Sequence, residues 1–134
     1  MNFLKTLNVE FNQISDLSPL SKLTKLQDLN IQNNKKTNLY SIRNLNGLTT
    51  LFVGHNKISD LNGIQHLKNL KSLYLQNNKI TDLSPLQECR LLAYLLINDN
   101  KITDITPLQH SAQLKYISIE LNFIADFQVI IVTY

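Results

Sequence analysis

The chain has 134 residues, of which 43% are hydrophobic and 17% are charged, and its formal net charge is +3. This balance favours one folded domain over an intrinsically disordered chain. The single cysteine, Cys89, excludes an intramolecular disulfide, and no stretch approaches the roughly 18 apolar residues that a transmembrane helix needs. The start of the chain lacks the basic and apolar regions of a secretory signal, so a cytoplasmic location is expected.

One phrase returns along the chain at a fixed interval. LNVEFNQISDLSPL (7–20), LFVGHNKISDLNGI (51–64), LYLQNNKITDLSPL (73–86) and LLINDNKITDITPL (95–108) are versions of it. The interval is 22 residues, and the six units follow one another without insertions, at 4–25, 26–47, 48–69, 70–91, 92–113 and 114–134. We therefore expect residues 1–134 to form a single domain of stacked repeats.

Every unit opens with alternating apolar and polar residues, as in Ser72-Leu73-Tyr74-Leu75-Gln76. This period of two predicts a short strand, with Leu73 and Leu75 facing inward and the other three side chains facing outward. The next stretch, NNKITDL, turns the chain away from the sheet. The second half of the unit, SPLQECRLL in this case, has apolar residues three apart, which predicts a 3₁₀ or irregular turn on the outer side. One unit cannot bury enough apolar surface to fold alone, so each unit needs its neighbours.

An asparagine returns in every unit where the predicted strand ends. Backbone groups at this bend lose their strand partners while they stay away from water, and an unpaired buried polar group costs about 1–3 kcal/mol. The asparagine side chain has both an acceptor and two donors, so it can satisfy the backbone of its own loop and of the next one. We expect a structural ladder formed by Asn12, Asn34, Asn56, Asn78, Asn100 and Asn122.

Two positions depart from the repeated pattern. Lys36 stands where the other repeats have isoleucine, and a lysine there must either extend outward or push the loop outward, so repeat 2 is expected to be locally distorted. Cys89 occupies a core column, which favours a buried thiol over a reactive one.

The spacing LxxLxLxxN and the phrases NQISDLSPLSKLTKLQDL and NKITDITPL resemble the 22-residue class of leucine-rich repeats. Bacterial internalins and the regulatory subunit of protein phosphatase 1 share this class. The resemblance extends from Leu4 to about Phe127. It implies an α/β fold, namely a right-handed horseshoe-shaped solenoid with a concave parallel sheet of about six short strands and 3₁₀ or irregular turns on the convex side. It also implies that the concave face binds another protein.

Large side chains gather at outward-facing strand positions in repeats 3 to 6. Aromatic residues are enriched at protein interfaces, so an aromatic patch on a strand face that does not face the core indicates binding. The alternative is that these rings only stabilise the sheet through contacts between neighbouring strands. The residues predicted to bind a partner are Phe52, Tyr74, Tyr94, Leu96 and Tyr116, together with His55 on the adjacent loop edge.

The charged residues offer weaker signals. Four lysines (Lys35, Lys57, Lys79 and Lys101) form a stacked column, and an aspartate follows three residues after each of the last three. The column is either a basic strip for nucleic acid or a solvated edge whose acids offset the lysines, and the second interpretation is favoured because no RNA-binding motif accompanies it. We find no metal-ligand spacing, phosphate-binding loop or nucleophile–base pattern, so no metal, cofactor, nucleic acid, membrane contact or enzymatic activity is expected.

Two hypotheses therefore remain for the function. The first is a protein–protein interaction module, regulatory or scaffolding, that binds a partner through its aromatic concave face. The second is a structural segment of a longer array, or a chain that self-associates through uncapped ends. The second rests on the short lead of Met1-Asn2-Phe3 before repeat 1 and on the apolar, uncharged run VIIVTY at the end of the sequence.

Overall fold

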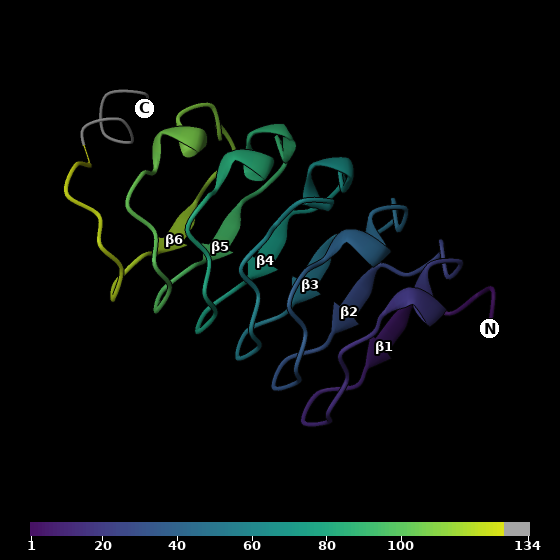
Figure 1. Ribbon diagram of the computed structural model, residues 1–134. Coiled ribbons are helices and arrows are strands. Elements are labelled where there is room, and N and C mark those ends of the chain that lie inside the picture. The colour runs from purple at the N-terminus through teal and green to yellow at the C-terminus, as the bar shows by residue number, and fades with distance from the viewer. Residues whose placement is uncertain (128–134) are drawn as a thin grey trace.

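The computed structural model describes residues 1–127 and contains six short strands with a 3₁₀ turn between each pair of neighbours. Figure 1 shows the strands side by side in one layer, with the 3₁₀ turns in a second layer and loops along the lower edge. The strands are β1 (Thr6–Asn8), β2 (Asp28–Asn30), β3 (Thr50–Phe52), β4 (Ser72–Tyr74), β5 (Tyr94–Leu96) and β6 (Tyr116–Ser118). The turns are η1 (Ser18–Leu20), η2 (Tyr40–Ile42), η3 (Ile64–His66), η4 (Ser84–Glu88) and η5 (Thr106–Leu108).

The sheet is open and parallel, with the strands in chain order from β1 to β6. Each strand pairs with the next at an offset of one repeat, so Leu29 lies opposite Leu51 and Leu51 opposite Leu73. The period of 22 residues therefore sets the register of the whole sheet. The predicted fold class is confirmed in its parallel sheet and its 3₁₀ turns. The run VIIVTY lies outside the described residues.

The core is a stack of aliphatic layers, one from each repeat. Leu51 and Leu73 in the strands and Ile58 and Ile80 in the following loops are fully buried. In the layers at the two ends of the described stack, the apolar side chains that pack against the core are only partly buried, except for Leu17, which is buried. Among residues 1–127, no helix is long and apolar enough to span a membrane.

Four of the five 3₁₀ turns on the convex side follow an aspartate, and η2 follows Asn38 instead. In repeat 4, Asp82 Oδ1 accepts hydrogen bonds from the Ser84 backbone N–H at 2.9 Å and from the Ser84 hydroxyl at 2.6 Å. These bonds, the hydroxyl bond first, lower the pKa of Asp82. Pro85 then fixes a backbone angle that suits the first residues of a 3₁₀ turn. An aspartate or asparagine side chain thus accepts a backbone N–H at or just before the start of each turn, which explains why this column recurs.

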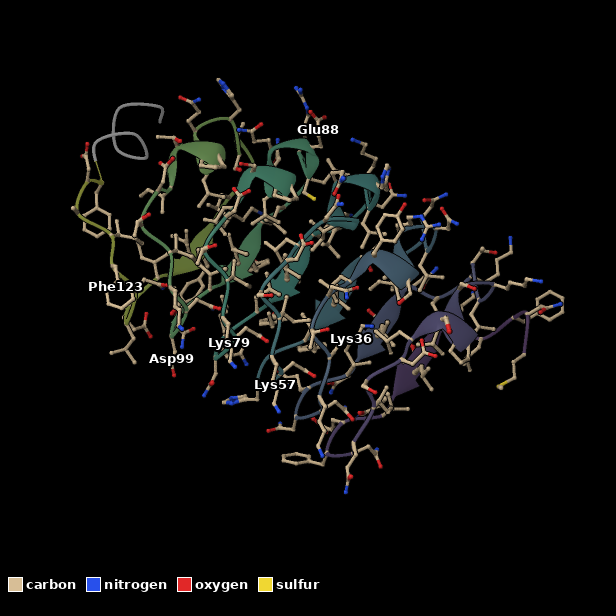
Figure 2. All side chains as sticks on the ribbon, in the orientation of Figure 1. Lys36, Lys57, Lys79, Glu88, Asp99 and Phe123 are labelled. Carbon is tan, nitrogen blue, oxygen red and sulfur yellow. The ribbon has the colours of Figure 1, made fainter. Side chains whose placement is uncertain are left out.

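Lys36 keeps the isoleucine position in the loop, and the local difference of repeat 2 lies just after it, in an isolated parallel bridge between Asn38 and Asp60. Lys36 is 5% exposed, and its backbone N–H donates to Asn56 Oδ1 at 2.9 Å, the same bond that Ile58 makes to Asn78. The long side chain instead reaches along the inside of the loop (Figure 2), where its ammonium donates to the carbonyl of Ser15 at 3.1 Å. A lysine therefore fits here because its aliphatic stem fills the layer and its charged end finds an oxygen.

Candidate functional site

The strands present two columns of outward side chains on the concave face, and the residues that directly follow the strands form a third. The first column starts each strand and contains Thr6, Asp28, Thr50, Ser72, Tyr94 and Tyr116. The second column ends each strand and contains Asn8, Asn30, Phe52, Tyr74, Leu96 and Ser118. The third column contains Glu10, Gln32, Gly54, Gln76, Asn98 and Glu120.

The second column holds a pair of stacked aromatic rings. Phe52 and Tyr74 lie opposite each other in the β3–β4 register, with ring centroids 4.5 Å apart and ring planes only 4° from parallel. Leu96 continues the column on β5. All three side chains are half-buried, so the sheet holds a continuous apolar strip on this face.

Two further tyrosines lie beside this strip in the first column. Tyr94 pairs with Tyr116 in the β5–β6 register, and the two side chains are 44% and 55% exposed. Tyr94 and Leu96 belong to the same strand and face the same side of the sheet. The register therefore brings together the five strand residues that the sequence singled out.

His55 does not lie on the strand face. Its backbone N–H donates to the carbonyl of Gln76 at 2.9 Å, and its side chain is exposed on the loop edge next to the third column. The histidine could therefore contact only a partner that extends over the rim of the concave face.

A glutamine bridge in the third column escaped the sequence analysis. Gln76 Nε2 donates to Gln32 Oε1 at 3.0 Å across the intervening repeat. This contact needs a glycine between them, because a Cβ atom at Gly54 would lie 2.6 Å from the Gln76 side chain. The only signal in the sequence is one glycine among polar residues of the same column.

A shallow depression of about 180 Å³ lies at the other end of the concave face, over β1 and β2. Leu7 and Leu29 form its floor, and the ring of Phe52 borders it. The depression exists because the outward side chains of β1 and β2 are smaller than the ring of Phe52 on β3. Its polar lining consists of Thr6, Asn8, Asp28 and Asn30.

The six asparagines hold the bend that follows each strand. Asn78 Nδ2 donates to the carbonyls of Leu75 at 3.0 Å, Gln76 at 3.4 Å and Val53 at 3.1 Å, and Asn78 Oδ1 accepts from the N–H of Ile58 at 2.9 Å. The five asparagines from Asn34 to Asn122 each bond to their own loop and to the preceding repeat in this way. Asn12 differs because it is exposed and bonds only within its own loop, to the carbonyls of Val9 and Glu10.

The residue before each asparagine adopts a left-handed backbone conformation, which the sequence analysis also missed. The angle φ lies between 55° and 59° at all six positions. Asparagine and aspartate tolerate this region, whereas bulky residues adopt it at a cost of about 1–2 kcal/mol. The presence of Asn33, Asn77 and Asp99 in the column was the available signal, and the column also contains Phe11, His55 and Leu121.

The lysine column lies on the exposed loop edge, where Figure 2 shows Lys57 and Lys79 away from the sheet. The aspartates that follow bond to the backbone instead: Asp60 and Asp104 accept the N–H groups of Asn62 and Thr106 at 2.8 and 2.9 Å. The ion pair found in the described part of the chain is elsewhere, between Lys68 and Glu88 at 3.4 Å. The four lysines are therefore exposed on the loop edge, and the aspartates that follow them bond to the backbone of the turns.

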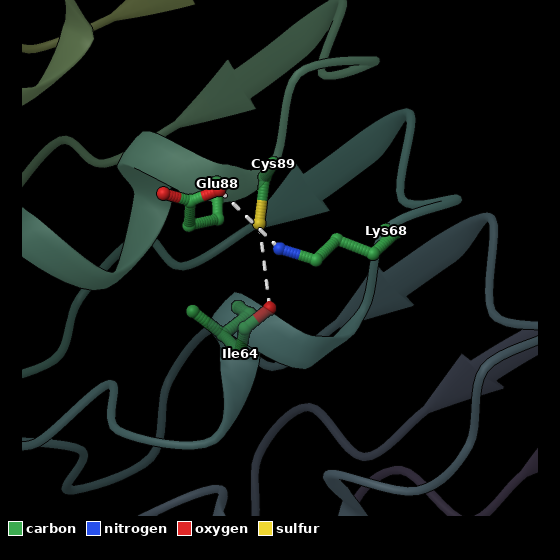
Figure 3. Close-up of polar contacts among 4 residues, drawn as sticks. All are labelled: Ile64, Lys68, Glu88 and Cys89. Atoms are coloured by element: carbon green, nitrogen blue, oxygen red, sulfur yellow. Dashed lines mark hydrogen bonds and ion pairs between the residues drawn. The ribbon is translucent and has the colours of Figure 1, made fainter.

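Cys89 is buried in the convex layer, as its core column predicted. Its thiol donates to the carbonyl of Ile64 at 3.3 Å, with Lys68 and Glu88 nearby (Figure 3). Burial raises the pKa of this thiol to about 11, against the opposing effect of the Lys68 charge. The thiol is thus protonated at neutral pH, and only the thiolate is nucleophilic. Within residues 1–127, no group of three His, Cys, Asp or Glu side chains could hold a metal ion.

Comparisons with known proteins agree on one family. The pattern described as leucine-rich repeats in two copies matches residues 3–44 and 46–88, more than half of the chain. No curated protein sequence matches the chain.

Three solved structures share the fold. Internalin C2 of Listeria monocytogenes is 34% identical over 88% of this chain, with a TM-score of 0.86, and another internalin of that organism, internalin F, is 33% identical over 95%, with a TM-score of 0.70. A leucine-rich repeat protein of Leptospira interrogans is 26% identical over 98% of this chain, with a TM-score of 0.88. The chain spans 52%, 44% and 35% of the lengths of these three structures.

Proposed function

This chain belongs to the leucine-rich repeat family, and from this we propose that it is a protein-binding module whose aromatic concave face contacts the partner. Leucine-rich repeat proteins generally act through interactions with other proteins. The proposed role is therefore binding and not catalysis.

The observation that carries the proposal is the pair Tyr94 and Tyr116, exposed beside the stacked rings of Phe52 and Tyr74. Tyrosine has few rotatable bonds and a large apolar area with a polar tip, so it gives much contact at a small entropy cost. The rigid sheet places these side chains before a partner arrives, which lowers the cost of ordering them. His55 adds a polar contact at the rim.

The competing interpretation is that the rings serve only the sheet. Rings on neighbouring strands stabilise a sheet by roughly 0.2–1 kcal/mol per pair. The stacked pair meets this description, because Phe52 and Tyr74 cover each other. The exposed fractions of Tyr94 and Tyr116 favour binding, since a ring that only supports its neighbours would be better covered.

The test is affinity capture with the wild-type chain beside the double variant Tyr74→Ala/Tyr94→Ala. Tyr40→Ala is the matched control, because Tyr40 is a tyrosine of similar exposure, 49%, on the convex side. Its ring centroid lies 4.0 Å from the guanidinium carbon of Arg43. We expect the double variant to lose captured proteins that the wild type and the control retain, while circular dichroism shows that all three are folded. If the double variant only melts earlier and captures the same proteins, the rings stabilise the sheet and the proposal is wrong.

A further inference from the structure

Charge is unevenly distributed between the faces of the molecule. The three columns of the concave face contain no lysine or arginine, although the chain as a whole has 13 of them and a net charge of +3. The same columns contain three acidic residues, Glu10, Asp28 and Glu120. The concave face is therefore negative, while the excess positive charge lies on the loop edge and the convex side.

Two of the three acidic residues lie apart from the aromatic side chains, whereas Glu120 follows β6 in the same repeat as Tyr116. Glu10 and Asp28 belong to the repeats of β1 and β2, next to the depression that the ring of Phe52 borders. The aromatic side chains belong to β3 to β6. A partner that crosses the strands would thus meet carboxylates first and apolar surface afterwards.

The carboxylates at the β1–β2 end accept hydrogen bonds from uncharged donors, amides at Glu10 and a hydroxyl at Asp28. Asn8 Nδ2 and Asn30 Nδ2 donate to the two oxygens of Glu10 at 3.4 and 3.2 Å, and the Thr6 hydroxyl donates to Asp28 at 3.5 Å. These donors orient the carboxylates and leave their charge uncompensated. No ion pair to Glu10 or Asp28 occurs within residues 1–127.

From this charge distribution we infer that the concave face takes an extended protein segment with lysine or arginine over β1 and β2 and apolar side chains over β3 to β5. The inference rests on the proposed function and names the chemistry of the partner. Five strands about 4.8 Å apart span roughly 19 Å, which an extended segment of about six residues covers. Complementary charge also steers the approach of the partner and selects against acidic segments.

The inference is tested by panning a random linear peptide library, displayed on phage, against the immobilised 134-residue chain. We expect the selected peptides to be enriched in lysine and arginine next to apolar residues. Synthetic copies should bind about tenfold more weakly to the variant Glu10→Gln/Asp28→Asn, because each neutral amide removes an attractive charge and keeps the shape. Binding should also weaken as salt increases.

Asp99→Asn is the control for removing a negative charge outside the three columns, one charge against the two that the double variant removes. Asp99 lies on the loop edge with a left-handed backbone, where the equivalent positions carry Asn33 and Asn77, so asparagine fits without strain. This variant should bind the selected peptides as the wild type does. Circular dichroism checks that the double variant remains folded.

The outcomes separate the two proposals. Peptides that lose binding to Tyr74→Ala/Tyr94→Ala but show no excess of cations, or that bind Glu10→Gln/Asp28→Asn as well as wild type, overturn the inference and leave the proposed function intact. Peptides that bind the tyrosine variant as well as wild type contradict the proposed function and the inference together. Failure to select any peptide also counts against both.

Discussion

Lys36 shows how a single side chain decides whether an irregular repeat stays in register. Its backbone bonds match those of the isoleucines at equivalent positions, and its ammonium reaches the Ser15 carbonyl inside the loop. The sequence indicated a charged residue in an apolar layer. It did not indicate which oxygen accepts the hydrogen bond of the ammonium, because that oxygen belongs to the backbone of the preceding repeat. Sequence patterns describe side chains, whereas this contact depends on where the main chain lies.

Replacing Lys36 with isoleucine should stabilise the protein. Burial lowers the pKa of Lys36, an effect that the nearby Asp16 carboxylate partly opposes. The charged form is therefore disfavoured in the folded state, and Lys36→Ile removes that penalty and restores the residue found at the other five equivalent positions. We expect a gain of about 0.5–2 kcal/mol in the free energy of unfolding at pH 7, measured by urea denaturation.

The gain in the free energy of unfolding of Lys36→Ile over the wild type should shrink as the pH rises. Because the folded-state pKa lies below the ordinary value of 10.5, the unfolded chain keeps its proton to higher pH, so the stability of the wild type rises as the pH approaches 10.5. Lys36→Ile lacks this contribution. Lys57→Ile, on the exposed loop edge, is the control and should give no comparable gain. A difference that widened with pH would show that the buried charge is not the cause.

At the scale of the element, each strand is only three residues long, and the bend after it holds the repeat together. Asn78→Leu should leave the buried N–H of Ile58 without its acceptor. The carbonyls of Val53 and Leu75 lose one of their two asparagine donors and keep Asn56 and Asn100. Each unsatisfied group costs about 1–3 kcal/mol, so the midpoint of urea denaturation should fall clearly. Asn12→Leu is the matched control and should cost less, because Asn12 is exposed and water can replace its bonds. Equal losses at both positions would refute the ladder as a stabilising element.

The strands and turns could be predicted because their signal repeats. Alternation placed Leu73 inward and Tyr74 outward, and the period of 22 residues gave the register that joins Tyr74 to Phe52. The glutamine bridge over Gly54 and the left-handed conformation at Phe11 and the equivalent positions were not predicted. The left-handed conformation occurs at residues as different as Phe11, His55 and Asp99, so residue type does not indicate it. The glutamine bridge depends on the space above Gly54, which the sequence does not show.

The depression next to Phe52 also lay beyond sequence analysis. The pattern placed Asn8, Asn30 and Phe52 in one column, and their order along the sheet follows from the register. A hollow, however, depends on how much of the floor formed by Leu7 and Leu29 the neighbouring side chains leave open. The residue columns predict which chemical groups a face presents, whereas the depth of a depression on that face depends on the positions of the atoms.

At the scale of the whole molecule, each repeat packs on its neighbours, apart from the hydrogen bond between Gln76 and Gln32 across repeat 3, and the identical repeat lengths make the layers interchangeable. Deleting residues 48–69 joins Gly47 to Leu70 and removes one complete unit. After this deletion β2 should pair with β4, and the backbone N–H of Lys36 should donate to Asn78 instead of Asn56, because both asparagines occupy the same position in their repeats. The shortened chain should therefore fold with the same secondary structure.

The measurement is urea denaturation followed by circular dichroism. The 22-residue deletion should unfold cooperatively. The slope of its free energy of unfolding against urea concentration should be lower by about a sixth, since this slope scales with the surface exposed on unfolding. Deletion of residues 48–58 is the control, because it removes half a unit and joins Gly47 to Ser59, which places the second half of repeat 3 where a strand should begin. That chain should lose its cooperative transition. An unfolded 22-residue deletion, or a cooperatively folded half-unit deletion, would mean that contacts beyond the nearest layer hold the sheet together.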